Sequence, residues 1–331
     1  MGKTEKLRLG IIGTNFVSDW LAEAARAEGS FTVQGVFSRK RETGDVFAAK
    51  HGIPEVYTDA EAFFSSDTID AVYVASPNFA HCAQTTAALS HGKHVLCEKV
   101  IATNLSEFRQ MRDAAEKNRC VLLEAMRPAF DPFAALVKEN LPKLGKLRRA
   151  AFEYCQYSSR YDRYKAGEIL NAFDPSLSNA AIMDIGVYII HICVHWFGKP
   201  RDVRSMSTFL PNGFEGAGHI LLDYGDMKAE LSYSKITESV NPSCITGENG
   251  ALTFGKISLP RDIRIRYRNG ETEEVPYTPA DNNMVHELAA FARQIRSGEW
   301  YSPHLDVSET EMEIIDEVRR QNGIVFPADR I

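Results

Sequence analysis

The chain has 331 residues, of which 44% are apolar and 25% are charged, so it is long enough for two domains with buried cores. Its net charge of -6 at pH 7 argues against a nucleic-acid-binding protein, which needs basic residues to neutralise phosphates. No apolar run approaches the ~20 residues of a membrane span, no signal peptide opens the chain and the six cysteines include no CxxC pair, which favours a cytoplasmic protein with reduced thiols and no membrane partner.

Short β-branched runs alternate with helix-period stretches in the N-terminal part of the chain. We predict strands over residues 7–13, 32–38, 71–76, 94–97 and 121–125, and helices over residues 16–27, 43–51 and 80–90. A further long helix begins after Asn104, where Glu107 completes a capping box. This alternation predicts a dinucleotide-binding Rossmann domain over residues 1–126, with a doubly wound parallel sheet.

The junction after the first predicted strand lies where a dinucleotide fingerprint places its glycines. Gly13 holds the first glycine position, whereas Asn15 and Ser18 replace the second and third. Asparagine tolerates a positive φ and serine is small enough for close packing. We therefore predict that the cofactor contacts Gly13, Thr14, Asn15 and Phe16, with a tight turn that binds no ligand as the alternative.

The second predicted strand ends in Ser38, Arg39, Lys40 and Arg41, without the carboxylate that usually holds the ribose hydroxyls of NAD. Cations and a hydroxyl suit a 2′-phosphate, so Ser38 and Arg39 are predicted to bind the cofactor, and NADP is favoured over NAD. A solvated basic loop is the alternative.

Polar residues follow two further strands, in the segments SPNFAH (76–81) and GKHVLCEK (92–99). The carboxyl ends of parallel strands meet at one edge of a doubly wound sheet, where ligands bind. The polar residues that these two segments bring to that edge include Asn78, His81, Glu98 and Lys99, which are therefore candidates to contact a ligand. A surface Lys–Glu pair at a strand end is the alternative for the last two.

After Arg127 the pattern changes to that of an α+β domain, assigned to residues 127–331. We predict helices over residues 131–140 and 180–196, and strands over residues 147–157, 203–209, 219–222, 228–233, 251–254 and 264–267. The turn signals between consecutive strands predict a mostly antiparallel open sheet. Two helices end the chain, and Ser308 with Glu311 is predicted to open the last one.

The apolar helix predicted over residues 180–196 carries a polar stripe. At ~100° per residue, Asp184, Tyr188, His191 and His195 fall within about 60° of one another. Polar side chains buried in this way need hydrogen-bond partners or a functional role. The i, i+4 spacing of His191 and His195 allows zinc, although the glutamate of an HExxH site is missing, and we predict no metal. Internal hydrogen bonds are the alternative, which fits His195 best.

These segments resemble the Gfo/Idh/MocA family, whose motifs include TPNxxH, GKHVLCEKP and a D-x-G-x-(H/Y) segment similar to MDIGVY (183–188). Members of that family carry a Rossmann domain and a C-terminal sheet domain, and oxidise or reduce sugars, polyols and related carbonyl compounds. Tyr188 stands where many members, including inositol dehydrogenases, have histidine, and where those resembling glucose-fructose oxidoreductase and dimeric dihydrodiol dehydrogenase have tyrosine. Val100 departs from the pattern, because the family has proline after the lysine.

The resemblance implies an NAD(P)-dependent dehydrogenase or reductase that acts on CH–OH groups. It makes Lys99 a catalytic lysine, places Asn78 and Glu98 by the nicotinamide ribose, and lines the cofactor with Ser76 and Pro77. It also sets Asp184 and Tyr188 opposite the lysine, where Asp184 would orient the substrate hydroxyl or Lys99. Tyr188 is then the proton donor or acceptor and Lys99 its electrostatic partner, because an ammonium favours the phenolate. Lys99 as the direct acid or base is the alternative. The residues expected on the substrate side are Arg127, Tyr161 and His191, with Arg160 and Arg163 nearby.

The expected partners are a small-molecule substrate and further copies of the chain, in a homodimer or higher oligomer formed through the C-terminal sheet. A catalytically silent dinucleotide sensor is the competing function, and a pure assembly subunit is a third. The motif residues Lys99, Asp184 and Tyr188 favour the enzyme, because a sensor needs no proton relay.

Overall fold

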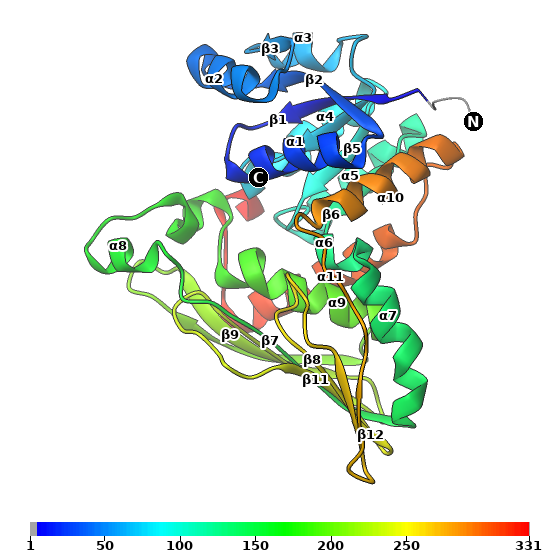
Figure 1. Cartoon of the computed structure of the whole chain (residues 1–331). Helices are drawn as coiled ribbons and strands as arrows, with labels where there is room; N and C mark the ends of the chain where they lie inside the picture. The colour runs from blue at the N-terminus through cyan, green and yellow to red at the C-terminus, as the bar shows by residue number, and fades with distance from the viewer. Residues whose placement is uncertain (1–4, 331) are drawn as a thin grey trace. The chain divides into compact units, whose positions relative to one another are not determined.

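The computed structural model describes residues 5–330 and divides the chain into two compact units (Figure 1). Unit 1 comprises the chain up to Arg127 together with Ala280–Asp306, and unit 2 comprises Pro128–Pro279 together with the chain from Val307 onward. The segment Ala280–Asp306, which the sequence-based division assigned to the second domain, therefore packs within unit 1.

Unit 1 is built on a six-stranded parallel sheet with the strand order β3-β2-β1-β4-β5-β6. The strands are β1 (Leu7–Ile12), β2 (Phe31–Phe37), β3 (Glu55–Tyr57), β4 (Ala71–Val74), β5 (His94–Glu98) and β6 (Leu122–Ala125). This order is that of a doubly wound Rossmann sheet, so the predicted fold class is confirmed. Strand β3 was not predicted, because its three residues are too few to show a period.

Three helices of unit 1 begin at side-chain caps, which are Asn15, Asp59 and Asn104. The helices of this unit are α1 (Phe16–Glu28), α2 (Arg41–His51), α3 (Ala60–Phe64), α4 (His81–Ser90), which follows the short η1 (Asn78–Ala80), α5 (Leu105–Asn118) and α10 (Met284–Ser297). Asn104 caps α5 as predicted by accepting from the backbone of Glu107, and the carboxylate of Glu107 accepts a hydrogen bond from the backbone of Thr103 at 2.9 Å. Helix α10 packs on α1, and its Phe291 stacks on Phe31 at 5.7 Å.

Unit 2 is built on an eight-stranded sheet with the order β14-β13-β12-β11-β7-β10-β9-β8. The strands are β7 (Leu147–Cys155), β8 (Asp202–Phe209), β9 (Glu215–Asp223), β10 (Lys228–Ser234), β11 (Ser243–Gly247), β12 (Gly250–Phe254), β13 (Arg264–Tyr267) and β14 (Thr272–Glu274). Strands β7 and β10 pair in parallel and the others antiparallel, which confirms the predicted open, mostly antiparallel sheet.

The helical segments of unit 2 include several short ones that the sequence did not predict. The set comprises α6 (Arg127–Phe130), α7 (Pro132–Asn140), η2 (Leu141–Leu144), α8 (Tyr161–Lys165), η3 (Asn171–Phe173), η4 (Pro175–Leu177), η5 (Ile182–Gly186), α9 (Val187–Phe197), α11 (His304–Asn322) and η6 (Pro327–Arg330). Segment η5 is a π-helix, so the 100° spacing assumed for Asp184 was wrong. The prediction that Ser308 opens the last helix was also wrong, because α11 begins at His304, one turn earlier.

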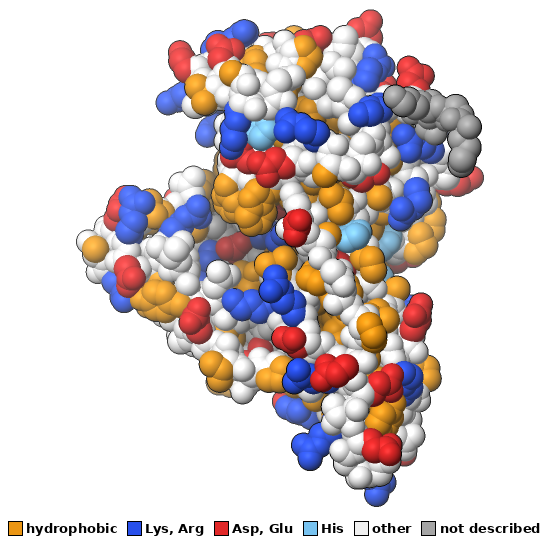
Figure 2. Space-filling model, in the orientation of Figure 1, with side chains coloured by type: hydrophobic (Ala, Val, Ile, Leu, Met, Phe, Trp, Pro, Cys, Tyr) orange, Lys and Arg blue, Asp and Glu red, His pale blue; other side chains and the backbone are white. Residues whose placement is uncertain are grey.

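Acidic and basic side chains are interspersed over the visible face of the molecule (Figure 2). On the sheet of unit 2 they form cross-strand pairs, such as Arg149 on β7 with Glu230 on β10 at 2.6 Å. None of the helices between residues 5 and 330 combines the length and apolarity that crossing a bilayer requires.

Candidate active site

The predicted cofactor residues of unit 1 gather at one edge of the parallel sheet. Ile12 lies beside both Phe37 and Val74, and Val74 lies beside Cys97, so β1, β2, β4 and β5 end at the same level. The residues that follow these ends are Gly13, Ser38, Ser76 and Lys99. The structure therefore brings four separate predicted segments together.

Gly13 forms the tight turn between β1 and α1. Its φ is +101°, and a Cβ added there would lie 2.6 Å from the carbonyl oxygen of Ala75, so the position requires glycine. Asn15 does not adopt the positive φ that we considered, because its φ is -88°. Instead its side chain caps α1 by accepting from the backbone of Val17 and Ser18, and it donates to the oxygen of Ala75 at 2.8 Å.

The loop after β2 exposes positive charge. Ser38 is buried, and its hydroxyl lies 2.7 Å from that of Thr43, so it holds the loop against α2. The side chains of Arg39 and Lys40 are exposed, and the N-terminus of α2 begins directly after them without a side-chain cap. The guanidinium of Arg41 forms an ion pair with the carboxylate of Asp45 at 2.9 Å. The arrangement offers two cations and a helix N-terminus to an anion.

Buried contacts fix the backbone that carries Lys99. The imidazole of His81 lies 2.9 Å from the carbonyl oxygens of both Val100 and Ser76, so it ties the ends of β4 and β5 together. Burial lowers the pKa of His81, and these carbonyls oppose that shift. The backbone of Ile101 donates to the buried carboxylate of Glu124 at 3.0 Å. The Lys99–Val100 peptide bond is cis, although residue 100 is not proline.

Glu98, beside Lys99, belongs to a buried polar cluster. Tyr73 on β4 donates a hydrogen bond to its carboxylate, and the backbone of Lys99 donates to it at 3.3 Å. Burial raises the pKa of Glu98, while the charges of Lys99 and Arg127 oppose that shift. A second carboxyl group, Glu287 on α10, is fully buried and electrostatically coupled to Glu98.

In unit 2, Asp184 on η5 is held by a lysine that the sequence analysis did not single out. The ammonium of Lys235, directly after β10, lies 2.7 Å from the carboxylate of Asp184 and donates to the oxygen of Ala172 at 2.7 Å. The rings of Phe173 and Phe214 lie 5.0 and 5.3 Å from the same ammonium. Lys235 is 3% exposed, so these contacts replace its hydration.

The segment that carries Asp184 and Tyr188 rests on β9 and β10. The buried carboxylate of Glu215 on β9 accepts a hydrogen bond from the backbone of Ile182 at 3.0 Å. Gly186 lies so close to the ring of Tyr233 that an added Cβ would approach it to 3.1 Å. Tyr188, at the start of α9, is nearly buried and packs edge-on against Tyr154 at 5.4 Å.

The other polar residues of the predicted helical stripe lie in separate environments. His191 Nδ1 lies 2.6 Å from the carboxylate of Glu311 on α11, and both side chains are buried. Burial lowers the pKa of His195 to about 4, so this imidazole is neutral near pH 7. His191, predicted on the substrate side, therefore has a buried carboxylate partner within unit 2.

The two other residues predicted on the substrate side lie in different units. Tyr161 stacks on Phe173 at 5.6 Å, which places it in the aromatic cluster around Lys235. Arg127, in unit 1, lies over the ring of Trp20 at 5.8 Å and contacts Asn283 at 3.4 Å. Of the neighbours considered with them, Arg163 is paired with Glu168 at the surface.

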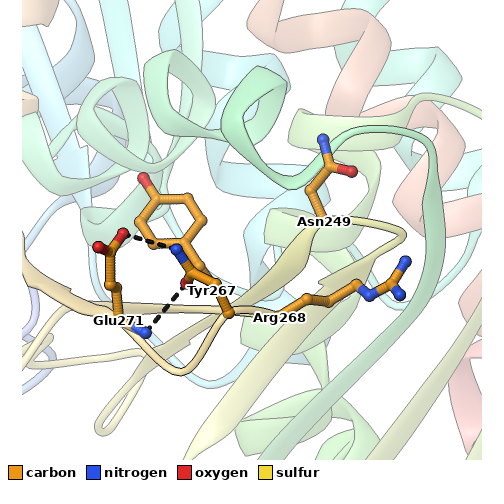
Figure 3. A pocket seen from close by; sticks show the side chains of 5 residues that line it. Asn249, Tyr267, Arg268 and Glu271 are labelled. Atoms are coloured by element: carbon orange, nitrogen blue, oxygen red, sulfur yellow. Dashed lines mark hydrogen bonds between the residues drawn. The ribbon is translucent and has the colours of Figure 1, made fainter.

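Two pockets on the surface of unit 2 are lined by residues outside the predicted site. Figure 3 shows one beside the β13–β14 turn, lined by Asn249, Tyr267, Arg268, Asn269 and Glu271. There the amide of Asn269 donates to the carboxylate of Glu271 at 2.8 Å, an interaction that shapes the turn. A second pocket is lined by Tyr154, which touches Tyr188, and by the exposed loop around Val240.

Residues 7–126 match the model of an oxidoreductase family with an NAD-binding Rossmann fold, Gfo/Idh/MocA, and residues 140–253 match the C-terminal domain of the same family. The chain is 41% identical to scyllo-inositol 2-dehydrogenase (NADP(+)) IolU of Bacillus subtilis, over 98% of this chain and 99% of that protein. The chain belongs to the Gfo/Idh/MocA family. The resemblance stated from its motifs is therefore confirmed.

Other Gfo/Idh/MocA relatives agree with this assignment. Human trans-1,2-dihydrobenzene-1,2-diol dehydrogenase is 26% identical over 98% of this chain and 99% of its own. Levoglucosan dehydrogenase, in complex with NADH and levoglucosan, has the same fold with a TM-score of 0.85 at 18% identity, covering 96% of this chain and 98% of that one. A 3-ketoreductase from Actinomadura kijaniata, in complex with NADP and TDP-benzene, superposes with a TM-score of 0.84 at 23% identity and the same coverage.

Membership of the Gfo/Idh/MocA family makes the chain an NAD(P)-dependent oxidoreductase that transfers hydride between a nicotinamide cofactor and a small alcohol or carbonyl compound. Its motifs pointed to Lys99, Asp184 and Tyr188, but not to Glu124, Glu287 or Lys235. A lone Lys, such as Lys235 in the sequence SYSKIT, carries no spacing signal. It could have been singled out only as a cation directly after a predicted strand.

Proposed function

We propose that this enzyme is an NADP(H)-dependent dehydrogenase of a cyclic polyol of the inositol class. The observation that carries the proposal is the 41% identity to IolU, which extends over essentially the full length of both proteins and is much higher than the 26% to the dihydrodiol dehydrogenases. Tyr188 stands at the position where the family has histidine or tyrosine, so a hydroxyl-bearing proton donor is available to such a substrate.

The sheet edge of unit 1 has the features that a bound dinucleotide needs. The turn at Gly13 leaves no room for a Cβ, and the exposed cations Arg39 and Lys40 stand beside the uncapped N-terminus of α2. We assign the pyrophosphate to the turn at Gly13 and the 2′-phosphate to Arg39 and Lys40. Asn78 and Glu98 are assigned to the nicotinamide ribose.

When bound, the nicotinamide exchanges a hydride with a carbon of the substrate. We assign the accompanying proton transfer to the hydroxyl of Tyr188 and the electrostatic support of that transfer to the ammonium of Lys99. A free tyrosine hydroxyl has a pKa near 10, so a neighbouring cation makes it a better base at neutral pH. Asp184, ion-paired with Lys235, orients a substrate hydroxyl by accepting its hydrogen bond.

A substrate panel tests the proposed substrate class. Inositols, aldoses, acyclic polyols, dicarbonyls and trans-diols are offered with NADP⁺ or NADPH, and the nicotinamide absorbance is followed. We expect an inositol to give the highest kcat/KM. Turnover of another class alone would contradict the inositol assignment, whereas no turnover on any class would contradict the proposed function as a whole.

Substitution of Arg39 tests the cofactor assignment. Two charge-assisted contacts to the 2′-phosphate, at about 1.5 kcal/mol each, predict that NADPH binds on the order of 100-fold more tightly than NADH. Arg39→Asp should reverse that preference, while Arg41→Asp, at a guanidinium already paired with Asp45, should change it little. Nicotinamide fluorescence titrations of the three proteins with both cofactors give the six dissociation constants. Equal affinities for both cofactors in the wild type would remove the basis of the assignment.

We also propose that copies of the chain associate through the sheet of unit 2 and that the protein acts in the cytoplasm. Met206 on β8 and Leu221 on β9 are 78% and 45% exposed on adjacent strands of that sheet, which favours a contact there. All six cysteines are free thiols, as a reducing compartment would keep them. Light scattering of the purified protein gives the oligomeric state, and a monomer would contradict the first proposal.

A further inference from the structure

Lys235 is a buried cation whose environment is built around one carboxylate. It follows directly after β10, its side chain is 4% exposed, and its ammonium lies 2.7 Å from Asp184. The oxygen of Ala172 and the faces of Phe173 and Phe214 complete its surroundings. An ammonium loses several kcal/mol of hydration when it is buried, and an ion pair recovers little more than that cost. Fold stability alone is therefore a weak reason for a lysine at this position.

The two partners of this ion pair differ in exposure. The side chain of Asp184 is 36% exposed, whereas that of Lys235 is not accessible enough to meet a ligand directly. Within this pair, the carboxylate of Asp184 is therefore accessible to solvent, whereas the ammonium of Lys235 is buried. A carboxylate backed by a fixed cation remains ionised and accepts a hydrogen bond in one orientation.

The backbone that carries Asp184 is fixed by the same two strands. Glu215 on β9 binds the N–H of Ile182 at the start of η5, and Tyr233 on β10 packs against Gly186 at its end. Lys235, two residues beyond Tyr233, holds the Asp184 side chain between these two points. Strands β9 and β10 thus hold both the backbone and the side chain of the segment.

We propose that Lys235 is a positioning residue for the reaction, which holds the Asp184 carboxylate ionised and correctly oriented for a hydroxyl of the substrate. This inference rests on the proposed function, in which Asp184 receives the substrate. Lys235 acts through Asp184 and does not contact the substrate itself. Its removal therefore weakens substrate binding and turnover without changing the dinucleotide site of unit 1.

A kinetic double-mutant cycle tests this role. Lys235→Met keeps the length of the side chain and suits its aromatic surroundings but removes the charge, and Asp184→Asn removes the charge of its partner. With the best polyol of the panel and saturating NADP⁺, we expect Lys235→Met to lower kcat/KM by about 10- to 100-fold, mostly through KM. The NADPH dissociation constant should change less than about threefold. In the Asp184→Asn background, Lys235→Met should lower kcat/KM by less than about threefold, because the two residues act as a unit.

Lys228→Met is the matched control, because Lys228 lies on the same strand and pairs with Asp223 at 2.7 Å on the surface. It should leave kcat/KM unchanged. If Lys235→Met lowers kcat/KM by the same factor in the Asp184→Asn background as in the wild type, Lys235 acts independently of Asp184 and the proposal is overturned. Thermal unfolding of the wild type, the two single variants and the double variant of the cycle identifies a variant that fails to fold. If Lys235→Met fails to fold, Lys235→Gln replaces it in the cycle.

A failure of the proposed function is distinguishable from a failure of this inference. Wild-type protein that oxidises none of the inositols contradicts the proposed function, and the cycle is then run with whichever substrate of the panel is turned over. If none is turned over, the shifts in melting temperature of the four proteins are compared. Additive shifts would overturn the inference, because they would show that the two side chains do not act as a unit.

Discussion

Glu287 on α10 is a carboxyl group placed where a charge is costly. It is fully buried, and neither of its oxygens has a hydrogen-bond partner among residues 5–330. Burial raises its pKa well above the ordinary value of 4.5, the charge of Glu98 adds to that shift, and Arg127 opposes it. In the folded protein Glu287 therefore keeps its proton over a pH range in which the unfolded chain releases it.

This protonation predicts a specific pH dependence of stability. Because the pKa of Glu287 is raised by folding, its contribution to stability is fully present below the unfolded value of 4.5 and is lost as the pH rises toward the folded pKa. Glu287→Gln removes that loss. Relative to wild type, the free energy of unfolding of the variant should increase by about 1–3 kcal/mol between pH 4.5 and pH 8.

Urea unfolding at several pH values between 4.5 and 8 measures this difference. Glu23→Gln, at an exposed position of α1, is the control and should show no such trend. A difference between Glu287→Gln and wild type that stays constant with pH would mean that Glu287 is ionised in the folded protein throughout this range.

At the scale of secondary-structure elements, the packing of η5 on β9 and β10 positions the segment that carries Asp184 and Tyr188. It depends on two glycines on either side of the buried Tyr233. Gly186 lies against its ring, and a Cβ added at Gly218 would lie 2.2 Å from its hydroxyl and 3.0 Å from the carboxylate of Glu215. Since Tyr233 is 1% exposed, its ring has little room to move away.

Gly218→Ala should therefore displace Tyr233 and Glu215 together. We expect a loss of about 1–3 kcal/mol in the free energy of unfolding, as for other overpacked cores, and a lower kcat with an unchanged NADPH dissociation constant. Gly255→Ala is the control, because an added Cβ there meets its nearest atom at an ordinary 3.4 Å. Wild-type stability and kcat in Gly218→Ala would show that η5 does not depend on this packing.

Local signals in the sequence predicted most elements but not the geometry of η5. Asn104 predicted the start of α5, and β-branched or alternating apolar runs predicted most strands of both sheets, but not β3, β11 and β14. The π-helical turn at Ile182–Gly186 has no such signal, since it depends on Glu215 and Tyr233, which lie far along the chain. The same applies to Lys235, whose contact with Asp184 is made only in the folded structure.

At the scale of the whole molecule, the chain contributes to unit 1 twice. Residues 280–306 return to it after the sheet of unit 2 is complete, and α10 then covers α1 with residues such as Phe291. The apolar spacing of this segment predicted a helix but not the unit that the helix joins, because helices of both units bury similar faces. The doubly wound sheet was predictable, since alternating strands and helices leave few topologies.

The central claim is that this Gfo/Idh/MocA enzyme transfers a proton through Tyr188 with the support of Lys99. The first of these residues lies in unit 2 and the second in unit 1. Neither belongs to the dinucleotide turn at Gly13, so chemistry and cofactor binding can be separated by substitution. A silent dinucleotide sensor would bind NADPH equally well but would not depend on either side chain.

Turnover and NADPH affinity of Tyr188→Phe, measured on the same preparation, test this claim most directly. The substitution keeps the ring that packs on Tyr154 but removes the transferable proton. We predict that kcat falls by roughly 10²–10⁴-fold while the NADPH dissociation constant changes only a few-fold. Lys99→Ala should be at least as damaging, and the double variant little worse than the worse single one. Near-full turnover in Tyr188→Phe on a confirmed substrate would contradict the account.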